Sequence, residues 1–360
     1  MTIAFIEPED VARPCNVSIQ IPIPFEYHQR MRKTDSAKWK SKLLSSSLPL
    51  EFEVAKVLAA RDFTVTANYP YQRVDAGIEK EFSVDIRANH LLPALRKIPA
   101  MPPLAIMIEC KQRHPGVTWL FLPNVNRGLR MNWSPAIRGI DVFSKAFLPT
   151  DRSAFDTQLD ACYKGVEVDV ANANVFDTEL RHGIAQLQFA LPVLLADLIE
   201  TALLTHPFND APFFFTAVIV TNAQLMVAHK SFGTRSVERA NDIARLGRVR
   251  PYLSVTVDGG PEFRSHLQRQ GKKLIPLMKS DGIVAITEAR KAAGADEGRL
   301  PSILISSMIM GTERLFRGNP FGNIIVCNAT HFPELLQGLK REAARLSRTS
   351  SFELPRRRAG

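Results

Sequence analysis

The sequence predicts an α/β protein with a mixed central sheet flanked by helices. Residues 104–111 are apolar until they end on Glu109 and Lys111, as expected for a central strand that is covered on both faces. A helix-like stretch at 179–204 precedes the strongly apolar segment 213–222. Because helices and strands alternate in this way along the chain, an α/β sheet is favoured over an all-α or all-β fold.

The composition is that of a basic globular protein. The 360 residues include 46 Lys and Arg and 36 Asp and Glu, so the formal net charge is +10, which suits a polyanionic partner. The four cysteines are far apart and form no CxxC pair, which argues against a zinc ribbon or a disulfide framework. The N-terminus lacks the features of a signal peptide, and the long apolar stretch contains a proline and acidic residues. We expect no membrane association and a cytoplasmic location.

Capping residues and periodicity predict the elements that precede the central strand. Ser47 and Pro49 indicate the start of a helix that should end near residue 61. Alternating apolar and polar residues predict strands in the segments that follow it. These strands are expected at 63–67, 82–87 and 117–122, and a proline-bearing insertion at 88–103.

The second half of the chain is less regular. Residues 123–178 have weak periodicity and predict a long insertion with one short helix at about 156–163. From about residue 235 a helix should carry three arginines, and the tail after residue 354 is expected to be disordered. The remaining elements are expected as strands at 252–257, 302–306 and 323–327 and as a closing helix at about 332–345.

These elements divide the chain into four parts. We expect a basic N-terminal arm at 1–47 and a core at 48–230, which contains the insertion at about 123–178. A C-terminal α/β extension at 231–348 and a basic tail at 349–360 follow.

Asp85, Glu109 and Lys111 form the pattern that points to chemistry. Alternate residues of a strand project to the same face, so Glu109 and Lys111 should point together while Cys110 points away. If the strand with Asp85 pairs with the strand that ends at Lys111, Asp85 lies beside Glu109. Two carboxylates make an oxygen site that suits Mg²⁺, with Mn²⁺ as a substitute, and the main-chain carbonyl of Cys110 would complete it.

Lys111 would add a cation to this site. A metal held by carboxylates supplies much of what phosphodiester cleavage needs. The ammonium group of Lys111 would either orient or deprotonate water, or stabilise the charge that develops on the phosphate, and the sequence leaves both roles open. The plain alternative is a strand that ends in two solvated charges.

The order of these elements resembles the PD-(D/E)xK nuclease superfamily, in particular its restriction-endonuclease-like branch, which includes methylation-dependent restriction enzymes and Holliday-junction resolvases. The resemblance covers residues 48–122, where a helix with Glu51 is followed by strands with Asp85 and with Glu109-Cys-Lys111. It implies a restriction-endonuclease-like sheet and Mg²⁺-dependent nuclease activity. The chain departs from the simplest relatives by its insertions, so the substrate type is left open.

The resemblance implies two accessory residues. Relatives often carry a helix glutamate twelve residues before the aromatic that opens the next strand, and counting back from Phe63 gives Glu51. Glu53 is the rival, but Glu51 shares its helix face with the apolar stripe. A glutamine of the later helix is also implied, either Gln186 or Gln188, with an ordinary surface glutamine as the alternative.

Basic and polar residues near the site are expected to hold substrate phosphates. Gln112 and Arg113 directly follow the central strand, and Arg127 and Arg130 lie in a basic run that also contains a tryptophan. For that run the alternative is a solvated basic face. DNA is favoured over RNA as the partner.

The sequence therefore predicts a Mg²⁺-dependent nuclease that hydrolyses phosphodiester bonds of DNA, an endonuclease of bacterial restriction or anti-phage defence. The alternative is a catalytically inactive restriction-like subunit that binds DNA or a partner within a larger complex. The chain has no GxxxxGK[ST] loop, GxSxG elbow or HExxH pair, so ATPase, serine hydrolase and zincin chemistry find no support. Homodimerisation or membership of a defence complex is open.

Overall fold

The computed structural model describes residues 33–93, 103–125, 136–140, 142, 147–148, 154–205, 212–292, 305–306, 308 and 321–349. The chain divides into two compact units, Met1–Leu43 and Leu44–Gly360. Helix α1 (Lys33–Ser45) spans the boundary between them. All strands among the described residues belong to the second unit.

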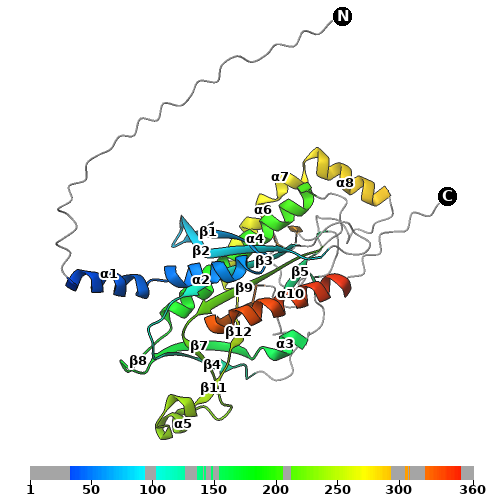
Figure 1. Ribbon diagram of the computed structural model, residues 1–360. Coiled ribbons are helices and arrows are strands. Elements are labelled where there is room, and N and C mark those ends of the chain that lie inside the picture. The colour runs from blue at the N-terminus through cyan, green and yellow to red at the C-terminus, as the bar shows by residue number, and fades with distance from the viewer. Residues whose placement is uncertain are drawn as a thin grey trace, which may run out of the picture. The chain divides into compact units, whose positions relative to one another are not determined.

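One large mixed sheet forms the second unit (Figure 1), which confirms the α/β class with a mixed sheet. Its strands are ordered β1-β2-β3-β9-β13-β12-β7-β4-β10-β11, and three short strands lie off this path: β5 pairs with β9 and β6, and β8 pairs with β7. Along the chain the strands are β1 (Thr64–Asp75), β2 (Ile78–Leu91), β3 (Pro103–Lys111), β4 (Val117–Pro123), β5 (Arg138–Ile140), β6 (Phe147–Leu148), β7 (Ala161–Asp169), β8 (Asn174–Phe176), β9 (Phe213–Thr221), β10 (Gln224–Ala228), β11 (Gly247–Val249), β12 (Tyr252–Thr256) and β13 (Asn323–Asn328).

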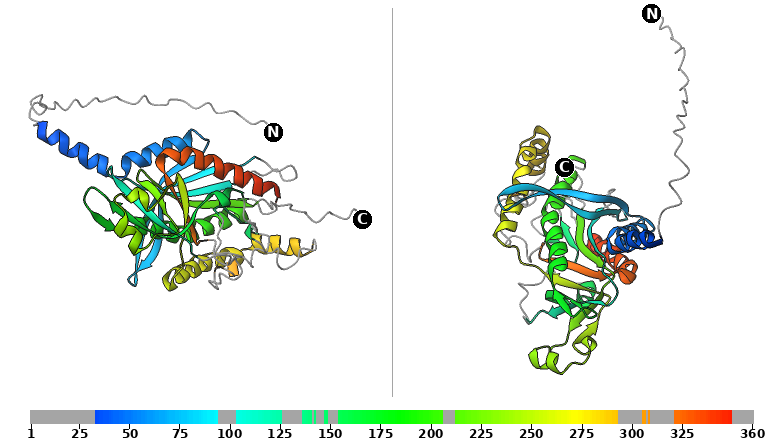
Figure 2. Two further views of the ribbon diagram at one scale, coloured as in Figure 1. Left: turned by 90° about the horizontal axis from the view of Figure 1, so that it is seen from below. Right: turned by 90° about the vertical axis from the view of Figure 1, so that its left-hand side faces the viewer.

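Helices cover both faces of this sheet. Helices α2 and α10 pack on one face, and α4 packs on the other with α6 against it (Figure 2). The α-helices of the second unit are α2 (Leu48–Ala59), α3 (Ala154–Gln158), α4 (Thr178–Thr205), α5 (Thr234–Arg239), α6 (Pro261–Lys273), α7 (Ile275–Met278), α8 (Asp281–Ala292) and α10 (Phe332–Thr349), with short 3₁₀ helices η3 (Ile243–Arg245) and η5 (Ala329–His331).

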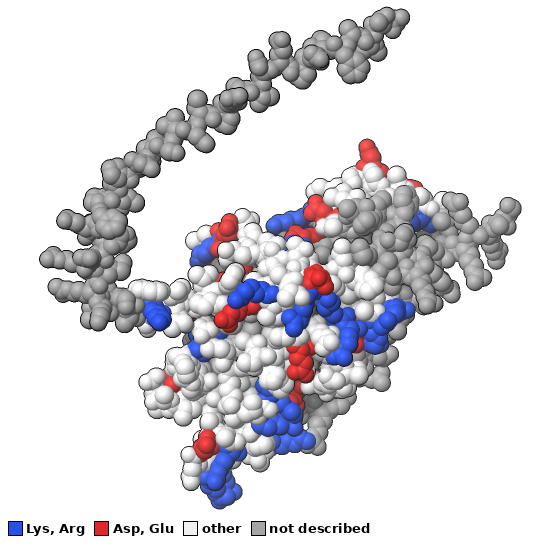
Figure 3. Space-filling view, in the orientation of Figure 1, with Lys and Arg blue, Asp and Glu red and all other residues white. Residues whose placement is uncertain are grey.

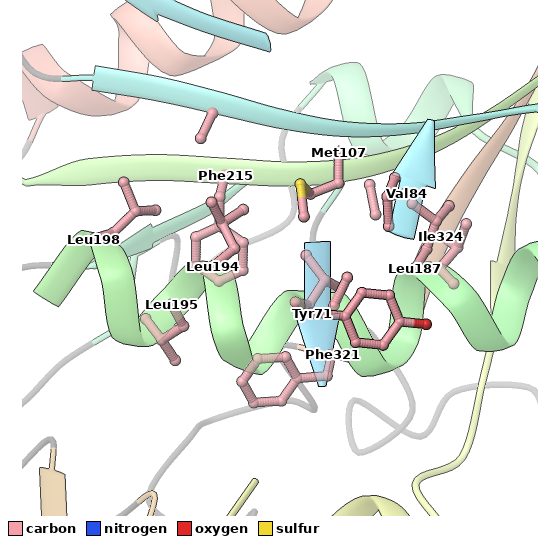
Figure 4. Packing of buried hydrophobic residues seen from close by; sticks show 14 of the residues in the cluster. Tyr71, Val84, Met107, Leu187, Leu194, Leu195, Leu198, Phe215, Phe321 and Ile324 are labelled. Carbon is pink, nitrogen blue, oxygen red and sulfur yellow. The ribbon is translucent and has the colours of Figure 1, made fainter. Parts of the chain in front are cut away.

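Strand β3 separates two hydrophobic cores, as its nearly continuous apolar sequence predicts. Ile106 and Ile108 point into the core beneath α2 and α10, whereas Ala105 and Met107 point into the core beneath α4. Figure 4 shows part of the second core, where Met107 lies close to leucines of α4. Each fully buried leucine or isoleucine contributes about 2 kcal/mol through the apolar surface it removes from water.

Helix α4 is the long apolar helix that the sequence predicts. By length and composition Thr178–Leu204 is apolar enough to cross a membrane, but 61% of its apolar window is buried inside the protein. Leu187, Leu191, Leu194 and Leu198 are among the residues that α4 contributes to the core. The helix is therefore a core helix of this fold.

Strands β1 and β2 form a longer hairpin than predicted. They pair from Thr64↔Asn89 to Asp75↔Ile78, and the two turn residues Ala76 and Gly77 have positive φ values of 50° and 81°. Such a two-residue turn matches the twist of the strands that it joins. Because β2 continues to Leu91, the insertion predicted at 88–103 was wrong over its first four residues.

The region 123–178 was wrongly predicted as an insertion, because it supplies β7 to the middle of the sheet. Strand β7 pairs antiparallel with β4 and parallel with β12. The sequence of β7 does not have a clear strand pattern, because it contains a glycine. A Cβ at Gly165 would come within 2.6 Å of Phe121, so a residue of low strand propensity is required there. The helix predicted at about 156–163 is α3, which ends at Gln158.

Two further elements differ from the prediction. The helix expected from residue 235 is divided into α5 and η3, and the strand expected at 302–306 is helical at Ile305 and Ser306, while 302–304 lie outside the described residues. The division drawn at residue 230 does not separate compact units, because β12 and β13 lie between β9 and β7 in the sheet. The tail 350–360 lies outside the described residues, as does most of the arm.

Candidate functional site

The β2–β3 ladder ends where the predicted site begins. The last pair is Ile86↔Ile108, so the same register places Asp85 opposite Glu109 at the next position. There the ladder stops, and the main-chain N–H of Cys110 donates to Oδ2 of Asp85 at 2.7 Å instead. The predicted pairing of the two strands is confirmed, and the end of the ladder leaves a carboxylate where a backbone partner would otherwise lie.

Glu109 and Lys111 share one face of β3, as predicted. The Nζ of Lys111 lies 2.8 Å from Oε1 of Glu109, and their side chains are only 12% and 2% exposed. The thiol of Cys110 points into the opposite core with Ile108. Strand geometry thus places a charged pair on the face of the sheet that α4 covers.

The carboxylate of Glu109 is buried without full compensation. Its Oε2 has no hydrogen-bond partner among the described residues. Burial, reinforced by the nearby Asp85 carboxylate and opposed by Lys111, raises the pKa of Glu109 to about 7. A buried carboxylate oxygen with no partner, beside a second carboxylate, favours a bound cation.

Glu51 joins this group from the first turn of α2. Burial and the nearby Asp85 carboxylate raise the pKa of Glu51, while Lys111 lowers it. Burial also raises the pKa of Asp85, against the lowering effects of the Cys110 N–H and Lys111. The rival Glu53 is exposed on α2. The structure therefore brings Glu51 and not Glu53 to the site.

Gln186 of α4 contacts the site from the helix side. Its Oε1 accepts from Nζ of Lys111 at 3.3 Å, and its Nε2 donates to the main-chain carbonyl of Ser83 at 3.3 Å. Gln188 donates to the main-chain carbonyl of Asp258 instead. Of the two glutamines left open by the sequence, Gln186 is the one beside Lys111.

Gly183 belongs to the site and the buried Tyr71 lies near Glu109, and neither was predicted from the sequence. A Cβ at Gly183 would lie 3.1 Å from Cε of Lys111 and 3.5 Å from Cγ of Glu109, so the glycine lets α4 approach β3 closely. The hydroxyl of Tyr71 is buried without a hydrogen-bond partner among the described residues, and burial, with a smaller contribution from Glu109, raises its pKa. A glycine inside a helix pattern was the available signal for the first of them.

The residues predicted to contact nucleic acid are only partly described. Arg127 and Arg130 lie outside the described residues, and Gln112 is half-buried beside Arg113. Arg113 was predicted to contact phosphate, but its guanidinium pairs with Glu167 at 2.7 Å and with Glu179 at 3.1 Å. It holds the loop after β3 in place and is not a free cation for phosphate.

The ligand set that fits a divalent cation consists of two carboxylates and one carbonyl. Among the described residues, no group of three or more His, Cys, Asp or Glu side chains is placed to hold a metal ion. The N–H and C=O of one strand residue point to the same neighbouring strand, so the carbonyl of Cys110 faces the Asp85 side, as its N–H does. Together with the unpartnered Oε2 of Glu109, these oxygens fit Mg²⁺, which keeps several waters.

Comparison with known proteins found no family model, curated protein or solved structure that matches this chain. Function is therefore inferred from the geometry of Asp85, Glu109 and Lys111 and from the residues that surround them.

Proposed function

We propose that this chain is a Mg²⁺-dependent nuclease of the PD-(D/E)xK type, an endonuclease that hydrolyses phosphodiester bonds of DNA in bacterial restriction or anti-phage defence. The observation that carries this proposal is the convergence of Asp85, Glu109 and Lys111 where the β2–β3 ladder ends. The order α2, β1, β2, β3 and the later helix α4, which brings in Gln186, support a restriction-endonuclease-like core within the sheet.

Asp85, Glu109 and the carbonyl of Cys110 would hold the metal. When bound, Mg²⁺ neutralises charge on the scissile phosphate and assists the formation of a nucleophilic water. The protein's own contribution is an oxygen site held in place before metal arrives. The Cys110 N–H fixes Asp85, and the hydroxyl of Thr221 donates to the carbonyl of Lys111 at 2.7 Å, which ties the end of β3 to β9.

Lys111 would act on the attacking water and on the phosphate. Its ammonium donates to Glu109 and to Gln186, so two oxygens fix its position on the face covered by α4. A fixed cation stabilises the negative charge that develops on the phosphate without reorganising during the reaction. Gln186 is a positioning residue in this scheme, because it acts through Lys111 and is itself held by the carbonyl of Ser83.

The charge and cysteine chemistry suit the proposed setting. A net charge of +10 favours association with a polyanion such as DNA. The described cysteines Cys110, Cys162 and Cys327 are free and buried, as expected in a reducing cytoplasm.

A cleavage assay tests the proposal directly. Purified protein would be incubated with duplex, single-stranded and branched DNA, and with RNA, in the presence of Mg²⁺ or Mn²⁺. We expect cleavage of at least one DNA substrate that stops when EDTA removes the metal. Failure to cut any of these substrates, or cleavage that continues in EDTA, contradicts the proposal.

Replacing Glu51 should weaken cleavage, and replacing Glu53 should not. Glu51→Gln removes a carboxylate that lies close enough to Asp85 and Lys111 for their charges to affect the pKa of Glu51. Loss of one such charge should lower the cleavage rate about tenfold to a hundredfold. Glu53→Gln, in the same turn of α2 but exposed, is the matched control and should retain the wild-type rate. Equal rates for both variants would remove Glu51 from the site.

Adding a methyl group at Gly183 should disturb the site without unfolding the protein. Gly183→Ala places its Cβ 3.1 Å from Lys111 Cε and 3.3 Å from Ile219 Cδ1, so Lys111 must move by a few tenths of an ångström. We expect a loss of cleavage of about tenfold, because small displacements of catalytic groups are costly. The Tm should change little, since the higher helix propensity of alanine offsets the crowding. Gly282→Ala in α8 meets nothing within 4 Å and should cleave at the wild-type rate.

Two observations favour the alternative of an inactive subunit that binds DNA or a partner. The described residues include no group of three or more side chains placed to hold a metal, and Lys111 already neutralises one oxygen of Glu109. Salt-dependent DNA binding without any heat of Mg²⁺ or Mn²⁺ binding would support this alternative.

A further inference from the structure

Residues 229–250, which connect β10 to β11 and include β11 and the residue after it, form a basic lobe that the proposed active site does not use. This lobe has six Lys and Arg residues and two acidic ones, a net charge of +4 within 22 residues. It protrudes at the lower end of the view in Figure 1, where α5 lies beyond β11. Figure 3 shows Lys and Arg side chains at the same end of the molecule.

Most of the charge in the lobe is uncompensated. Lys230, Arg235, Arg239 and Arg245 are exposed, and none forms an ion pair with another described residue. Arg248 and Arg250 differ, because both pair with Asp160 on the body of the protein, at 2.6 and 2.5 Å. Two arginines therefore anchor the lobe, and four cations face water.

The lobe is a built structure and not a loose loop. Met226↔Val249 to Ala228↔Gly247 close its base as an antiparallel ladder. Phe232 and Ile243 pack against the hydrophobic cluster of Leu120, Met226 and Ala228. In contrast, α5 buries none of its own residues, so its sequence is not explained by packing. Because the base of the lobe is already paired and packed, its backbone need not be ordered when the exposed arginines bind a ligand.

The chain runs from the candidate site into the lobe. Thr221, the last residue of β9, pairs with Lys111, and β10 follows after two residues. From Thr221 to Ala228 the chain spans at most roughly 23 Å, at about 3.3 Å per residue. The base of the lobe is thus at most about seven base pairs of duplex away from Thr221, the partner of Lys111 in the sheet, at about 3.4 Å per base pair.

We propose that this lobe binds backbone phosphates of double-stranded DNA in the part of the duplex that flanks the scissile bond. The inference rests on the proposed nuclease function for the position of the scissile bond. Exposed guanidinium groups suit phosphate oxygens, and a set of unpaired cations on a convex surface fits the outside of a duplex better than it fits a pocket ligand. Contacts of this kind position the substrate and carry no sequence information.

The test compares two double variants with the wild-type chain. Arg235→Gln with Arg239→Gln removes two exposed cations of α5, and Arg341→Gln with Arg348→Gln removes two exposed arginines of α10 as the matched control. Binding to labelled duplexes of about 8 and 24 base pairs would be measured by fluorescence anisotropy without divalent metal, over a range of salt concentrations. Cleavage of the same duplexes would be measured with Mg²⁺ present.

We expect the lobe variant to bind the long duplex on the order of tenfold more weakly at 0.15 M salt, with the salt slope reduced by about 1.8. The short duplex, cut near its middle, extends only about four base pairs to either side of the scissile bond and offers the lobe fewer phosphates. Its binding and cleavage should therefore change less than those of the long duplex, and the α10 variant should match wild type throughout. Unchanged binding of the long duplex, or equal weakening in both variants, overturns the inference. So does a wild-type chain that binds anionic vesicles or an acidic peptide through the lobe and binds no DNA. If the wild-type chain cuts no DNA but the lobe variant still binds the long duplex more weakly, the lobe is a DNA contact and only the proposed nuclease function is rejected.

Discussion

Asp85→Asn and Lys111→Ala should each reduce the rate of DNA cleavage by about 10³-fold while the protein stays folded. The asparagine side chain keeps an oxygen that accepts from the Cys110 N–H but loses the charge needed to hold a divalent cation. Lys111→Ala removes the cation that contacts both Glu109 and Gln186. Single-turnover cleavage of a labelled duplex with saturating Mg²⁺ measures the loss.

The matched control for this pair is Asp75→Asn with Lys80→Ala. Asp75 and Lys80 form an ion pair of 2.7 Å on the exposed part of the β1–β2 hairpin, so the same charges are removed away from the site. Their removal should leave cleavage unchanged, and circular dichroism should show that all variants are folded. If Asp85→Asn and Lys111→Ala cut as fast as this control, the three residues are not a catalytic site.

Glu109→Gln should stabilise the metal-free protein by about 3 kcal/mol at pH 8. Burial raises the pKa of Glu109 from 4.5 to about 7 in the folded protein. Each tenfold change in proton affinity corresponds to about 1.4 kcal/mol. The folded state binds more protons than the unfolded state between pH 4.5 and 7, so this residue lowers stability progressively as pH rises through that window. Because glutamine is neutral, the Glu109→Gln variant does not lose this stability as pH rises.

The pH dependence distinguishes this effect from an ordinary packing change. Denaturant unfolding in EDTA should give equal free energies of unfolding for wild type and Glu109→Gln near pH 4.5, and the gap should open as pH rises to about 7 and then stay constant. Glu53→Gln, which replaces an exposed glutamate, should follow the wild-type curve. A Glu109→Gln protein that is less stable than wild type at pH 8 would show that the buried carboxylate is already compensated.

Local patterns were sufficient to predict the strands and helices that place the site. The apolar run of β3 and its charged end predicted a central strand with Glu109 and Lys111 on one face, and their 2.8 Å contact agrees. The resemblance pointed to Glu51, and its helix face favoured it over Glu53. These predictions succeeded because they depend on strand and helix periodicity, which a single segment contains.

Contacts between distant segments could not be predicted in the same way. Strand β7 was missed because Gly165 and buried charged residues interrupt its pattern, and their partners lie on other segments of the chain. Arg113 was taken for a phosphate contact because its partner Glu167 is 54 residues away along the chain. Tyr71 and Gly183 approach Glu109 only after the hairpin and α4 pack on the sheet. Such residues are found from tertiary packing and not from periodicity.

Calorimetric titration of Mn²⁺ into the purified wild-type chain and into Asp85→Asn tests the central claim most directly. If Asp85 and Glu109 hold a divalent cation, the wild-type protein should bind Mn²⁺ with release of protons at pH 7, because the pKa of Glu109 is about 7 without metal. Asp85→Asn should show little or no binding. Equal binding by both proteins, or no binding by either, would contradict the assignment of this site as a metal centre.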